Sequence, residues 1–216
     1  MRVALVVGTL ACAIAVGCLL PELGPLAGGD DASVDASVDV ATFDAGPDSN
    51  ADAAKDAAPD GKPIALYRIN AGGLAVGSFV SDIFFDGGSV NSGGSTIDLS
   101  LAGDAAAPES AYTVYRFTDP TPFTYALPTD PNRPVLVRLH FADVFQTDAG
   151  ARIFDVQING TTVLKNFDII ATAKGPNKAI LRDFPATADA NGNVVVTFVA
   201  GSAGNAIINA IELYTR

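Results

Sequence analysis

Four aspartates are the side chains in this sequence best suited to acid–base chemistry: Asp119, Asp143, Asp148 and Asp155. Two carboxyl groups held about 5–9.5 Å apart are what glycoside hydrolysis requires. Each of these acids also has an ordinary structural explanation. Asp119 precedes a proline and favours a turn. Asp143 and Asp148 flank a predicted loop, and Asp155 points out of a predicted strand. We therefore expect no enzymatic activity, and hydrolysis is the alternative.

His140 is the only histidine, and it lies within a predicted strand near Arg138. A catalytic role would require a nucleophile in a suitable turn, and the G-x-S-x-G pattern is absent. The only cysteines, Cys12 and Cys18, lie near the N-terminus, so the remaining chain has no disulfide and no Cys-based metal site. We expect His140 to be packed or hydrogen-bonded, and we expect no catalytic residue, metal or cofactor. A calcium site made of loop oxygens stays open.

Aromatic side chains near predicted loops indicate a different chemistry, the recognition of sugars. The chain has five Tyr, twelve Phe and no Trp. Sugar sites place ring faces against apolar C–H surfaces and add a few amides, carboxylates or arginines for the hydroxyls. A single ring of this kind belongs more often to the core, but as a set these rings could line one groove. The set comprises Phe84, Phe85, Tyr115, Phe117 and Phe145.

Short strands and tight turns must position these residues. Between residues 135 and 141, apolar side chains alternate with Arg138 and His140, which is the period of a strand buried on one face. The segment 153–158 repeats this alternation, and Asn159-Gly160 then predicts a two-residue hairpin. Further strands are expected at 64–69, 111–117, 123–127, 161–164, 179–184, 194–199 and 207–214. With no convincing helix, this pattern predicts an all-β fold, an antiparallel β-sandwich or jelly roll.

The first 18 residues have the features of an export signal. Arg2 is followed by an uncharged apolar run that is shorter than the about 20 residues of a membrane span. The sequence from Ala15 to Cys18 resembles a bacterial lipobox, in which the cysteine carries the lipid. We expect Cys18 to be lipidated. An ordinary cleaved signal or an uncleaved anchor is the alternative.

Residues 19–62 form a biased acidic segment. From Asp30 to Lys62, nine Asp stand against two Lys, a balance of −7, whereas residues 63–216 carry −4 of the total −11. Because the segment has so few large apolar residues, their burial cannot offset the entropy lost on ordering it. We therefore expect a disordered linker, which repulsion between its negative charges keeps extended. The remaining 154 residues, 63–216, are long enough for a core of their own. Neither part has a basic patch, so a nucleic-acid partner is not expected.

Five blocks, taken together and in order, resemble the malectin family of di-glucose-binding domains. They are Leu66–Gly73, Phe123–Pro128, Val135–Asp143, Arg152–Ile169 and Asn205–Leu213. The resemblance covers residues 65–213, and it implies a jelly-roll-like β-sandwich without catalysis. It also implies a sugar site on loops, built from several aromatic side chains and one carboxylate.

Transferred onto this chain, the family's site is only partly kept. One family Tyr falls on or beside Phe85, and an adjacent Tyr and Phe fall on Phe145 and Gln146. A further Tyr falls where no aromatic residue stands, in Asn91–Ser95, and the carboxylate falls near Asn205. A recurrent Arg corresponds to Arg116, either bracing a loop or facing the sugar. The expected carbohydrate-binding residues are Phe85, Tyr115, Arg116, Phe145, Gln146 and Asn205.

These patterns and the resemblance together predict a non-catalytic, lectin-like surface lipoprotein. Its partner would be an oligosaccharide or polysaccharide containing glucose or a related sugar. The protein would be exported, periplasmic or at the cell surface, and it would meet the membrane only through the lipid on Cys18. The alternative is a structural, adhesion or protein-interaction module that has lost sugar binding, because a fold alone does not define a function.

Overall fold

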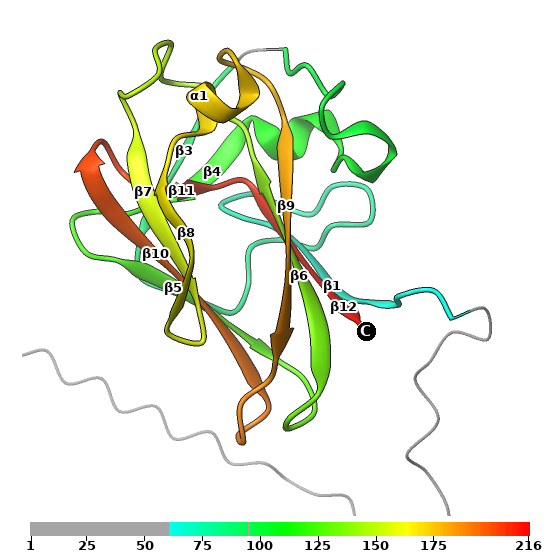
Figure 1. Ribbon diagram of the computed structural model, residues 1–216. Coiled ribbons are helices and arrows are strands. Elements are labelled where there is room, and N and C mark those ends of the chain that lie inside the picture. Colours follow the sequence, from blue (N-terminus) through cyan, green and yellow to red (C-terminus); the bar gives the residue numbers. More distant parts are fainter. Residues whose placement is uncertain (1–60, 95) are drawn as a thin grey trace, which may run out of the picture. The chain divides into compact units, whose positions relative to one another are not determined.

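The computed structural model describes residues 61–94 and 96–216. The predicted signal, the predicted lipidation site at Cys18 and the acidic segment up to residue 60 lie outside the described residues. Within them, two antiparallel sheets and a smaller third sheet make up the domain (Figure 1). The fold is the predicted β-sandwich.

The first sheet has the strand order β1-β12-β6-β9. Its strands are β1 (Ala65–Asn70), β12 (Ala210–Thr215), β6 (Pro134–Phe141) and β9 (Ile180–Thr187). The second sheet has the order β2-β5-β10-β7-β8. Its strands are β2 (Phe85–Asp86), β5 (Phe123–Pro128), β10 (Asn193–Ala203), β7 (Ile153–Ile158) and β8 (Thr161–Phe167). The third, in the order β11-β4-β3, contains β11 (Ile207–Ile208), β4 (Val114–Phe117) and β3 (Ser89–Ser92).

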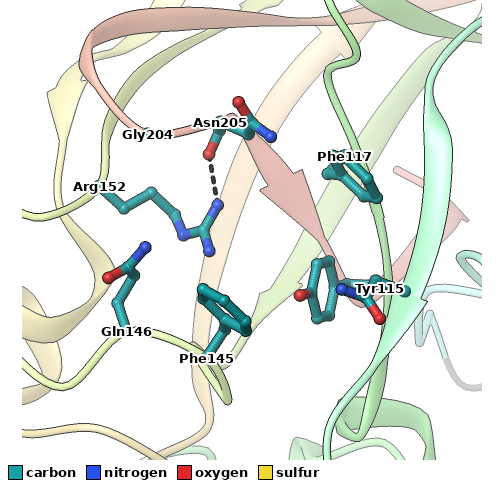
Figure 2. Close-up of a pocket in the computed structure, with 8 residues that line it drawn as sticks. Tyr115, Phe117, Phe145, Gln146, Arg152, Gly204 and Asn205 are labelled. Carbon is teal, nitrogen blue, oxygen red and sulfur yellow. Dashed lines mark hydrogen bonds between the residues drawn. The ribbon is translucent and has the colours of Figure 1, made fainter.

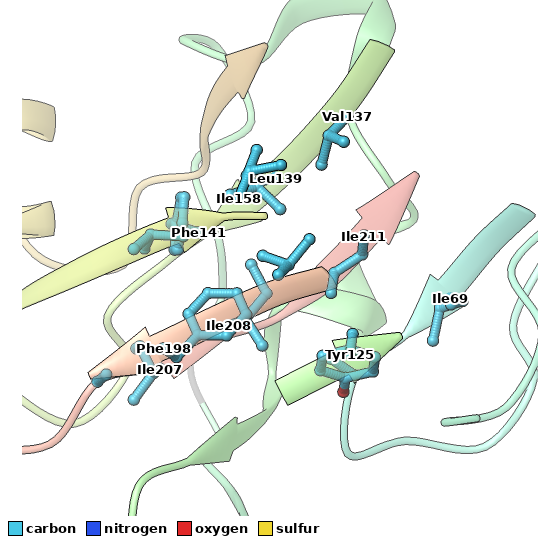
Figure 3. Packing of buried hydrophobic residues seen from close by; sticks show 14 of the residues in the cluster. Ile69, Tyr125, Val137, Leu139, Phe141, Ile158, Phe198, Ile207, Ile208 and Ile211 are labelled. Carbon is cyan, nitrogen blue, oxygen red and sulfur yellow. The ribbon is translucent and has the colours of Figure 1, made fainter. Parts of the chain in front are cut away.

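The main core lies between the two larger sheets (Figure 3). Strand β6 contributes the side chains that the alternation predicted, and all four are fully buried: Val135, Val137, Leu139 and Phe141. From the opposite sheet, the rings of Phe123 and Phe198 stack at 4.7 Å between centroids. Burying a side chain of this size stabilises the fold by roughly 1.5–3 kcal/mol. The two larger sheets are therefore held together by the apolar side chains on their facing surfaces.

The hairpin between β7 and β8 forms where the sequence predicts it. Asn159 and Gly160 have φ angles of 48° and 77°. These left-handed conformations are what a type I′ turn requires, and Asn and Gly adopt them most readily. The Asn159 amide also donates to the Thr187 carbonyl, which ties this turn to the end of β9.

Two predicted strands differ from the structure. The first half of the segment 111–117 lies at the end of a 3-10 helix, Glu109–Tyr112, and only Val114–Phe117 is a strand. The segment 207–214 is divided at Asn209 into β11 and β12, which belong to different sheets. Asn209 stabilises this change of sheet, because its Nδ2 donates to the carbonyls of Tyr112 and Val114 and its Oδ1 accepts from the Ala142 amide.

A short helix was also not expected. Helix α1 spans Ile169–Ala173, and the Asp168 side chain caps it by accepting a hydrogen bond from the Ala171 amide. Asp is a favoured N-cap residue, so Asp168 was the signal in the sequence. Across residues 61–94 and 96–216, no helix is long and apolar enough to cross a bilayer.

A second apolar cluster covers one end of the first sheet on its outer face. It contains Phe79, Ile97, Ala107 and Tyr112, which pack against Ala210 of β12. Because this cluster lies over the sheet there, its outward-pointing residues are not exposed to solvent.

Candidate functional site

A pocket of about 190 Å³ opens where loops meet the edge of the third sheet. Strands β3 and β4 form one wall, and two connections complete it: the loop between β6 and β7 and the link from β10 to β11 (Figure 2). The lining residues are Asn91, Tyr115, Phe117, Phe145, Gln146, Arg152, Gly204 and Asn205. The pocket is smaller than the roughly 300–1,000 Å³ that drug-sized ligands occupy, and it suits a small ring with a few polar substituents.

The register between β3 and β4 decides which side chains face the pocket. Asn91 lies opposite Tyr115, and Val90 lies opposite Arg116. Because successive side chains of a strand point to opposite faces, Tyr115 and Phe117 line the pocket while Arg116 points away from it. Burial raises the pKa of the Tyr115 hydroxyl, so this group is a neutral hydrogen-bond donor at physiological pH.

A buried ion pair holds the opposite wall. Asp143 Oδ2 accepts a hydrogen bond of 2.6 Å from Arg152 Nε, and Arg152 Nη1 donates to the Asn205 carbonyl at 2.7 Å. The second oxygen of Asp143 accepts from the amides of Phe145 and Gln146. Asp143 is 1% exposed and Arg152 5% exposed. This carboxylate therefore fixes three pocket segments from behind and is not presented to a ligand.

Phe145 is the exposed ring of the pocket, with 67% of its surface accessible. Its backbone is held by Asp143, so the ring stands at the rim on a fixed loop. Figure 2 shows Phe145 and Tyr115 on neighbouring sides of the pocket, with Gln146 and Arg152 beyond them. Rings supplied by different segments, with amides between them, are the arrangement that suits a sugar ring.

Phe85 and Arg116 do not line this pocket. Arg116 is buried, and its Nε and Nη2 donate to Asp82 Oδ2 at 3.0 and 2.7 Å. Its Nη1 donates to the carbonyls of Gly87 and Gly88, and its guanidinium carbon lies 3.5 Å from the Phe85 ring centroid. The sequence left two roles open for Arg116, bracing a loop or facing a sugar. Its contacts are those of a residue that stabilises the surrounding loop.

The other aspartates are engaged separately. Asp119 accepts from the Ser89 hydroxyl, Asp148 from the Thr147 hydroxyl and Asp155 from the Asn166 amide. None of the eight lining residues carries a carboxyl group. Within the described part of the chain, no group of three or more His, Cys, Asp or Glu is placed to hold a metal ion. The pocket thus offers rings, amides and a guanidinium, without a carboxylate pair.

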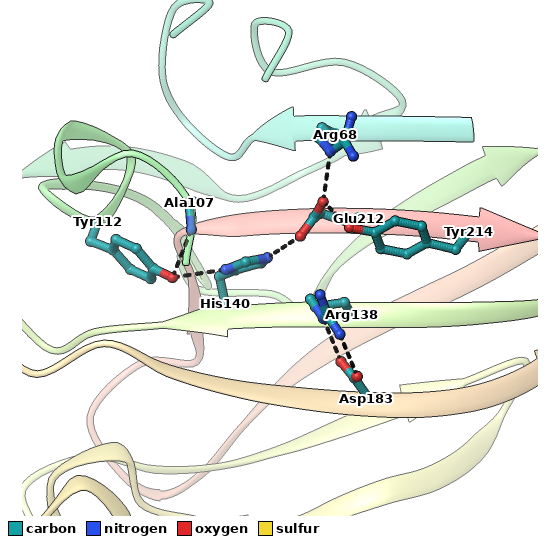
Figure 4. Close-up of polar contacts among 8 residues, drawn as sticks. All are labelled: Arg68, Ala107, Tyr112, Arg138, His140, Asp183, Glu212 and Tyr214. Carbon is teal, nitrogen blue, oxygen red and sulfur yellow. Dashed lines mark hydrogen bonds and ion pairs between the residues drawn. The ribbon is translucent and has the colours of Figure 1, made fainter. Parts of the chain in front are cut away.

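His140 lies in a buried polar network away from the pocket (Figure 4). Its Nδ1 is 2.8 Å from the Tyr112 hydroxyl, and its Nε2 is 2.8 Å from Glu212 Oε1. The ring is fully buried, because the second apolar cluster covers this end of the sheet. It is hydrogen-bonded, as the sequence favoured, but it is not on the half-exposed face that the alternation suggested.

Arg152 and Asn91 line the pocket but were not among the predicted site residues. Asn91 lies opposite Tyr115, a pairing between strands far apart in the sequence. The sequence did contain a pattern that could have identified Arg152. Asp143 directly follows one strong strand pattern and Arg152 directly precedes the next, so the two residues stand at the two ends of one loop. Opposite charges at such positions favour an ion pair that closes the loop.

The chain belongs to the malectin family, because the malectin domain matches residues 65–211. It is similar to a probable receptor-like protein kinase of Arabidopsis thaliana, with 28% identity over 175 residues, which are 69% of this chain and 21% of that protein. It is also similar to receptor-like protein 4 of the same plant, with 41% identity over 101 residues, 45% of this chain and 16% of that protein. The chain therefore matches about a fifth of the first relative and about a sixth of the second.

Solved structures of plant receptor ectodomains share the fold. The extracellular domain of ANXUR1 from Arabidopsis thaliana has a TM-score of 0.63 and 17% identity, covering 70% of this chain and 48% of that one. The plant receptor-like kinase FER gives 0.62 and 18%, covering 70% and 49%. FER in complex with the plant peptide RALF23 and LLG2 gives 0.60 and 18%, covering 70% and 48%. At these identities the likeness is one of fold.

Proposed function

We propose that this domain is a non-catalytic module that binds carbohydrate in the pocket of Tyr115 and Phe145. The observation that supports this function is the lining itself, in which three aromatic rings and three amides converge on a space of about 190 Å³. Ring faces supply the apolar contact and the amides supply hydrogen bonds to hydroxyls. The absence of a carboxylate from this lining favours binding over glycoside hydrolysis.

The pocket is also held ready for a ligand. Its segments are fixed by Asp143 and Arg152, both buried, so a ligand would order few groups on binding. A preorganised site loses less entropy on association than a mobile one. The ligand class we propose is an oligosaccharide or polysaccharide, of which one or two sugar units enter the pocket.

A glycan array with the full chain, followed by calorimetry on each hit, tests this function. We expect Phe145→Ala to weaken binding by about tenfold or more, equivalent to about 1.4 kcal/mol, because it removes the exposed ring. Phe85→Ala is the matched control, since that ring is 43% exposed but lies outside the lining. Circular dichroism would confirm that both variants fold.

Two results would contradict the proposal. One is that a folded chain binds no glycan on the array. The other is that a glycan binds but Phe85→Ala weakens it while Phe145→Ala does not, which would place the sugar elsewhere.

A second candidate is a protein-interaction module. Five of the eight exposed large apolar residues in the described ranges come from one segment: Leu74, Val80, Phe84, Phe85 and Val90. Exposed apolar residues mark an interaction surface where they form a contiguous patch. The solved complex of FER with a peptide and LLG2 supports a protein ligand for this fold. A folded chain that is silent on the array would favour this candidate.

We further propose that residues 1–18 direct export, that residues 19–62 are a disordered linker, and that residues 63–216 form the binding domain. Cys18 would carry the lipid that holds the protein at the cell surface or in the periplasm. Metabolic labelling with a fatty-acid analogue tests this arrangement in a bacterial host. Label on the native chain and none on Cys18→Ser is the expected result. No label on either would leave an ordinary cleaved signal or an uncleaved anchor.

A further inference from the structure

A second pocket, of about 290 Å³, lies on the outer face of the first sheet. The second apolar cluster covers the opposite end of that face and leaves this end accessible. We call it the outer-face pocket, and its lining residues are Lys62, Pro63, Leu136, Arg138 and Tyr214. It shares no residue with the pocket of Tyr115 and Phe145, so the two are separate sites.

Strands β6 and β12 supply the floor of the outer-face pocket. Leu136 lies directly opposite Tyr214, so the two side chains share one face of the sheet. Arg138 is on the same face two residues further along β6, and its guanidinium carbon lies 5.5 Å from the centre of the Tyr214 ring (Figure 4). The floor is therefore an aliphatic side chain and an aromatic ring with a cation beside them.

The chain that leads into β1 supplies the wall. The Ile64 amide donates to the Thr215 hydroxyl at 2.9 Å, and the Ile64 carbonyl accepts from the Thr215 amide at 2.8 Å. These two bonds hold the preceding residues, Lys62 and Pro63, beside the end of β12. The pocket thereby gains a second cation and a further apolar surface.

Arg138 has one terminal nitrogen left for a ligand. Its Nε and Nη2 donate to the two oxygens of Asp183 at 2.8 and 2.7 Å, whereas Nη1 has no hydrogen-bond partner among the described residues. Asp183 fixes the guanidinium from the opposite side, so Nη1 offers its hydrogens with little further loss of side-chain freedom. Hydrogen bonds from a guanidinium to a carboxylate are roughly twice as strong as those between neutral groups.

The charges around the outer-face pocket favour an anion, although the domain as a whole is acidic. None of the five lining residues carries a carboxyl group. The two acids of the neighbouring row are already bound, Glu212 by Arg68 and Asp183 by Arg138. With Lys62 added, these groups amount to three cations against two acids.

The same lining is poorly suited to a sugar. It contains no amide, and its only hydroxyl, that of Tyr214, donates to Glu212. Most hydroxyls of a sugar would therefore meet apolar surface and lose their hydrogen bonds on binding. An aromatic ring has no such loss, and it packs well against a tyrosine ring and aliphatic groups.

We propose that the outer-face pocket is a second binding site, for a carboxylate joined to an aromatic ring. The ring packs against Tyr214, Leu136 and Pro63. The carboxylate accepts hydrogen bonds from Arg138 Nη1 and lies near the Lys62 ammonium. Such a group occurs as a free aromatic acid and as the C-terminal aromatic residue of a peptide. This site does not depend on the proposed carbohydrate function.

Nuclear magnetic resonance of the isotope-labelled full chain in about 150 mM salt tests this site. The probes are 3-phenylpropionate and a tripeptide that ends in phenylalanine with a free carboxylate. Each is compared with its own amide, which keeps the shape and removes the charge. We expect the acids to shift the backbone signals of Leu136 and Tyr214, and to bind about tenfold or more tightly than their amides. Hexanoate, which lacks the ring, should bind more weakly than 3-phenylpropionate.

Three variants at exposed positions test the role of charge. Lys62→Glu should weaken binding by about tenfold or more, because it reverses a charge of the lining. Lys165→Glu is the matched control, the same change at an exposed lysine of β8 in the other large sheet, and it should leave binding unchanged. Asp183→Asn should tighten binding, because it removes the carboxylate that competes for Arg138. Since all three side chains are exposed, each variant should keep the folded spectrum.

Several results would overturn this assignment: no binding of either acid, equal binding of acids and amides, or shifts confined to Tyr115 and Phe145. Equal losses from Lys62→Glu and Lys165→Glu would also overturn it, since net charge alone would then attract the probes. Hexanoate that binds as tightly as 3-phenylpropionate overturns the preference for a ring. Binding of the free acid alone supports a small-molecule ligand, and binding of the peptide alone supports a protein C-terminus. Silence on a glycan array overturns only the carbohydrate function.

Discussion

Glu212→Gln should destabilise the domain far more than its position on the outer face of a sheet suggests. Glu212 lies in a row of alternating charges across four strands, from Arg68 through Glu212 and Arg138 to Asp183. The carboxylate is only 3% exposed. It accepts hydrogen bonds from Arg68 Nε at 2.9 Å, from His140 Nε2 at 2.8 Å and from the Tyr214 hydroxyl.

The magnitude follows from the burial of each partner. Removing one member of a buried ionic network costs about 3–5 kcal/mol. The Arg68 side chain is 37% exposed, so solvent screening limits the contribution of the Arg68–Glu212 ion pair to below about 1 kcal/mol. His140 is fully buried, and an amide nitrogen placed against its N–H would leave a donor unpaired. We therefore expect a loss of about 3 kcal/mol, or about 6–12 °C in Tm for a domain of this size.

Asp183→Asn is the matched control from the same row. Asp183 binds Arg138 through two hydrogen bonds of 2.8 and 2.7 Å, but 40% of its side chain is exposed. An exposed pair of this kind contributes at most about 1 kcal/mol. Urea unfolding followed by circular dichroism measures both variants. If the two substitutions lower the free energy of unfolding by the same amount, burial does not determine how much each charge in this row contributes, and the prediction is wrong.

The pH dependence gives an independent check. Burial raises the pKa of Glu212, but the hydrogen bonds from His140 and Tyr214 outweigh it, so the pKa lies below its usual value of 4.5. A carboxyl group whose folded pKa is lowered stabilises the fold above its unfolded pKa, and this contribution is lost as the pH falls. The difference between the native chain and Glu212→Gln should therefore be full at pH 6–7 and shrink below about pH 4.5.

Three further predictions concern stability. Burial raises the pKa of Tyr112 to about 12, so its contribution is intact below pH 10 and should fall by about 3 kcal/mol as the pH rises from 10 to 12. In alkaline melts Tyr112→Phe should lose about that much less stability than the native chain, because the raised pKa values of Tyr115, Tyr125 and Tyr214 remain. Arg116→Lys should lower the free energy of unfolding in urea by about 3 kcal/mol, because lysine cannot reproduce the four hydrogen bonds and the ring contact of Arg116. A loss under about 1 kcal/mol would contradict the proposed role of Arg116 in stabilising the loop. Gly88→Ala should cost more than Gly160→Ala: both have positive φ, but only at Gly88 would a Cβ lie 2.8 Å from a carbonyl oxygen, and equal melting shifts would refute this.

Local patterns predicted most of the fold. The alternation of Val135 to Phe141 and the Asn159-Gly160 turn depend on neighbours in the sequence, and the structure confirms both. Contacts between distant segments were beyond such patterns. Asn209 reads as a residue within a strand, but its side chain bonds to Tyr112, Val114 and Ala142 and divides that strand.

The lining of the candidate pocket was predictable to a similar extent. Tyr115, Phe145, Gln146 and Asn205 meet in one pocket, although they come from separate segments. Phe85 and Arg116 do not join them, because β4 alternates and turns Arg116 to its other face, where Asp82 binds it. The face on which a strand residue lies depends on register, and register depends on pairings that one sequence does not reveal.

Asp143 and Arg152 hold the pocket in place, whereas exposed residues make up much of its lining. This difference explains how ligand preference can change within this fold. Asp143 and Arg152 are buried and hold three segments, so substituting either would cost several kcal/mol. Asn91, Phe145 and Asn205 are exposed, and substitutions at exposed positions usually change stability by less than about 0.5 kcal/mol. The exposed ring and amides of the lining can therefore be exchanged without loss of the sandwich.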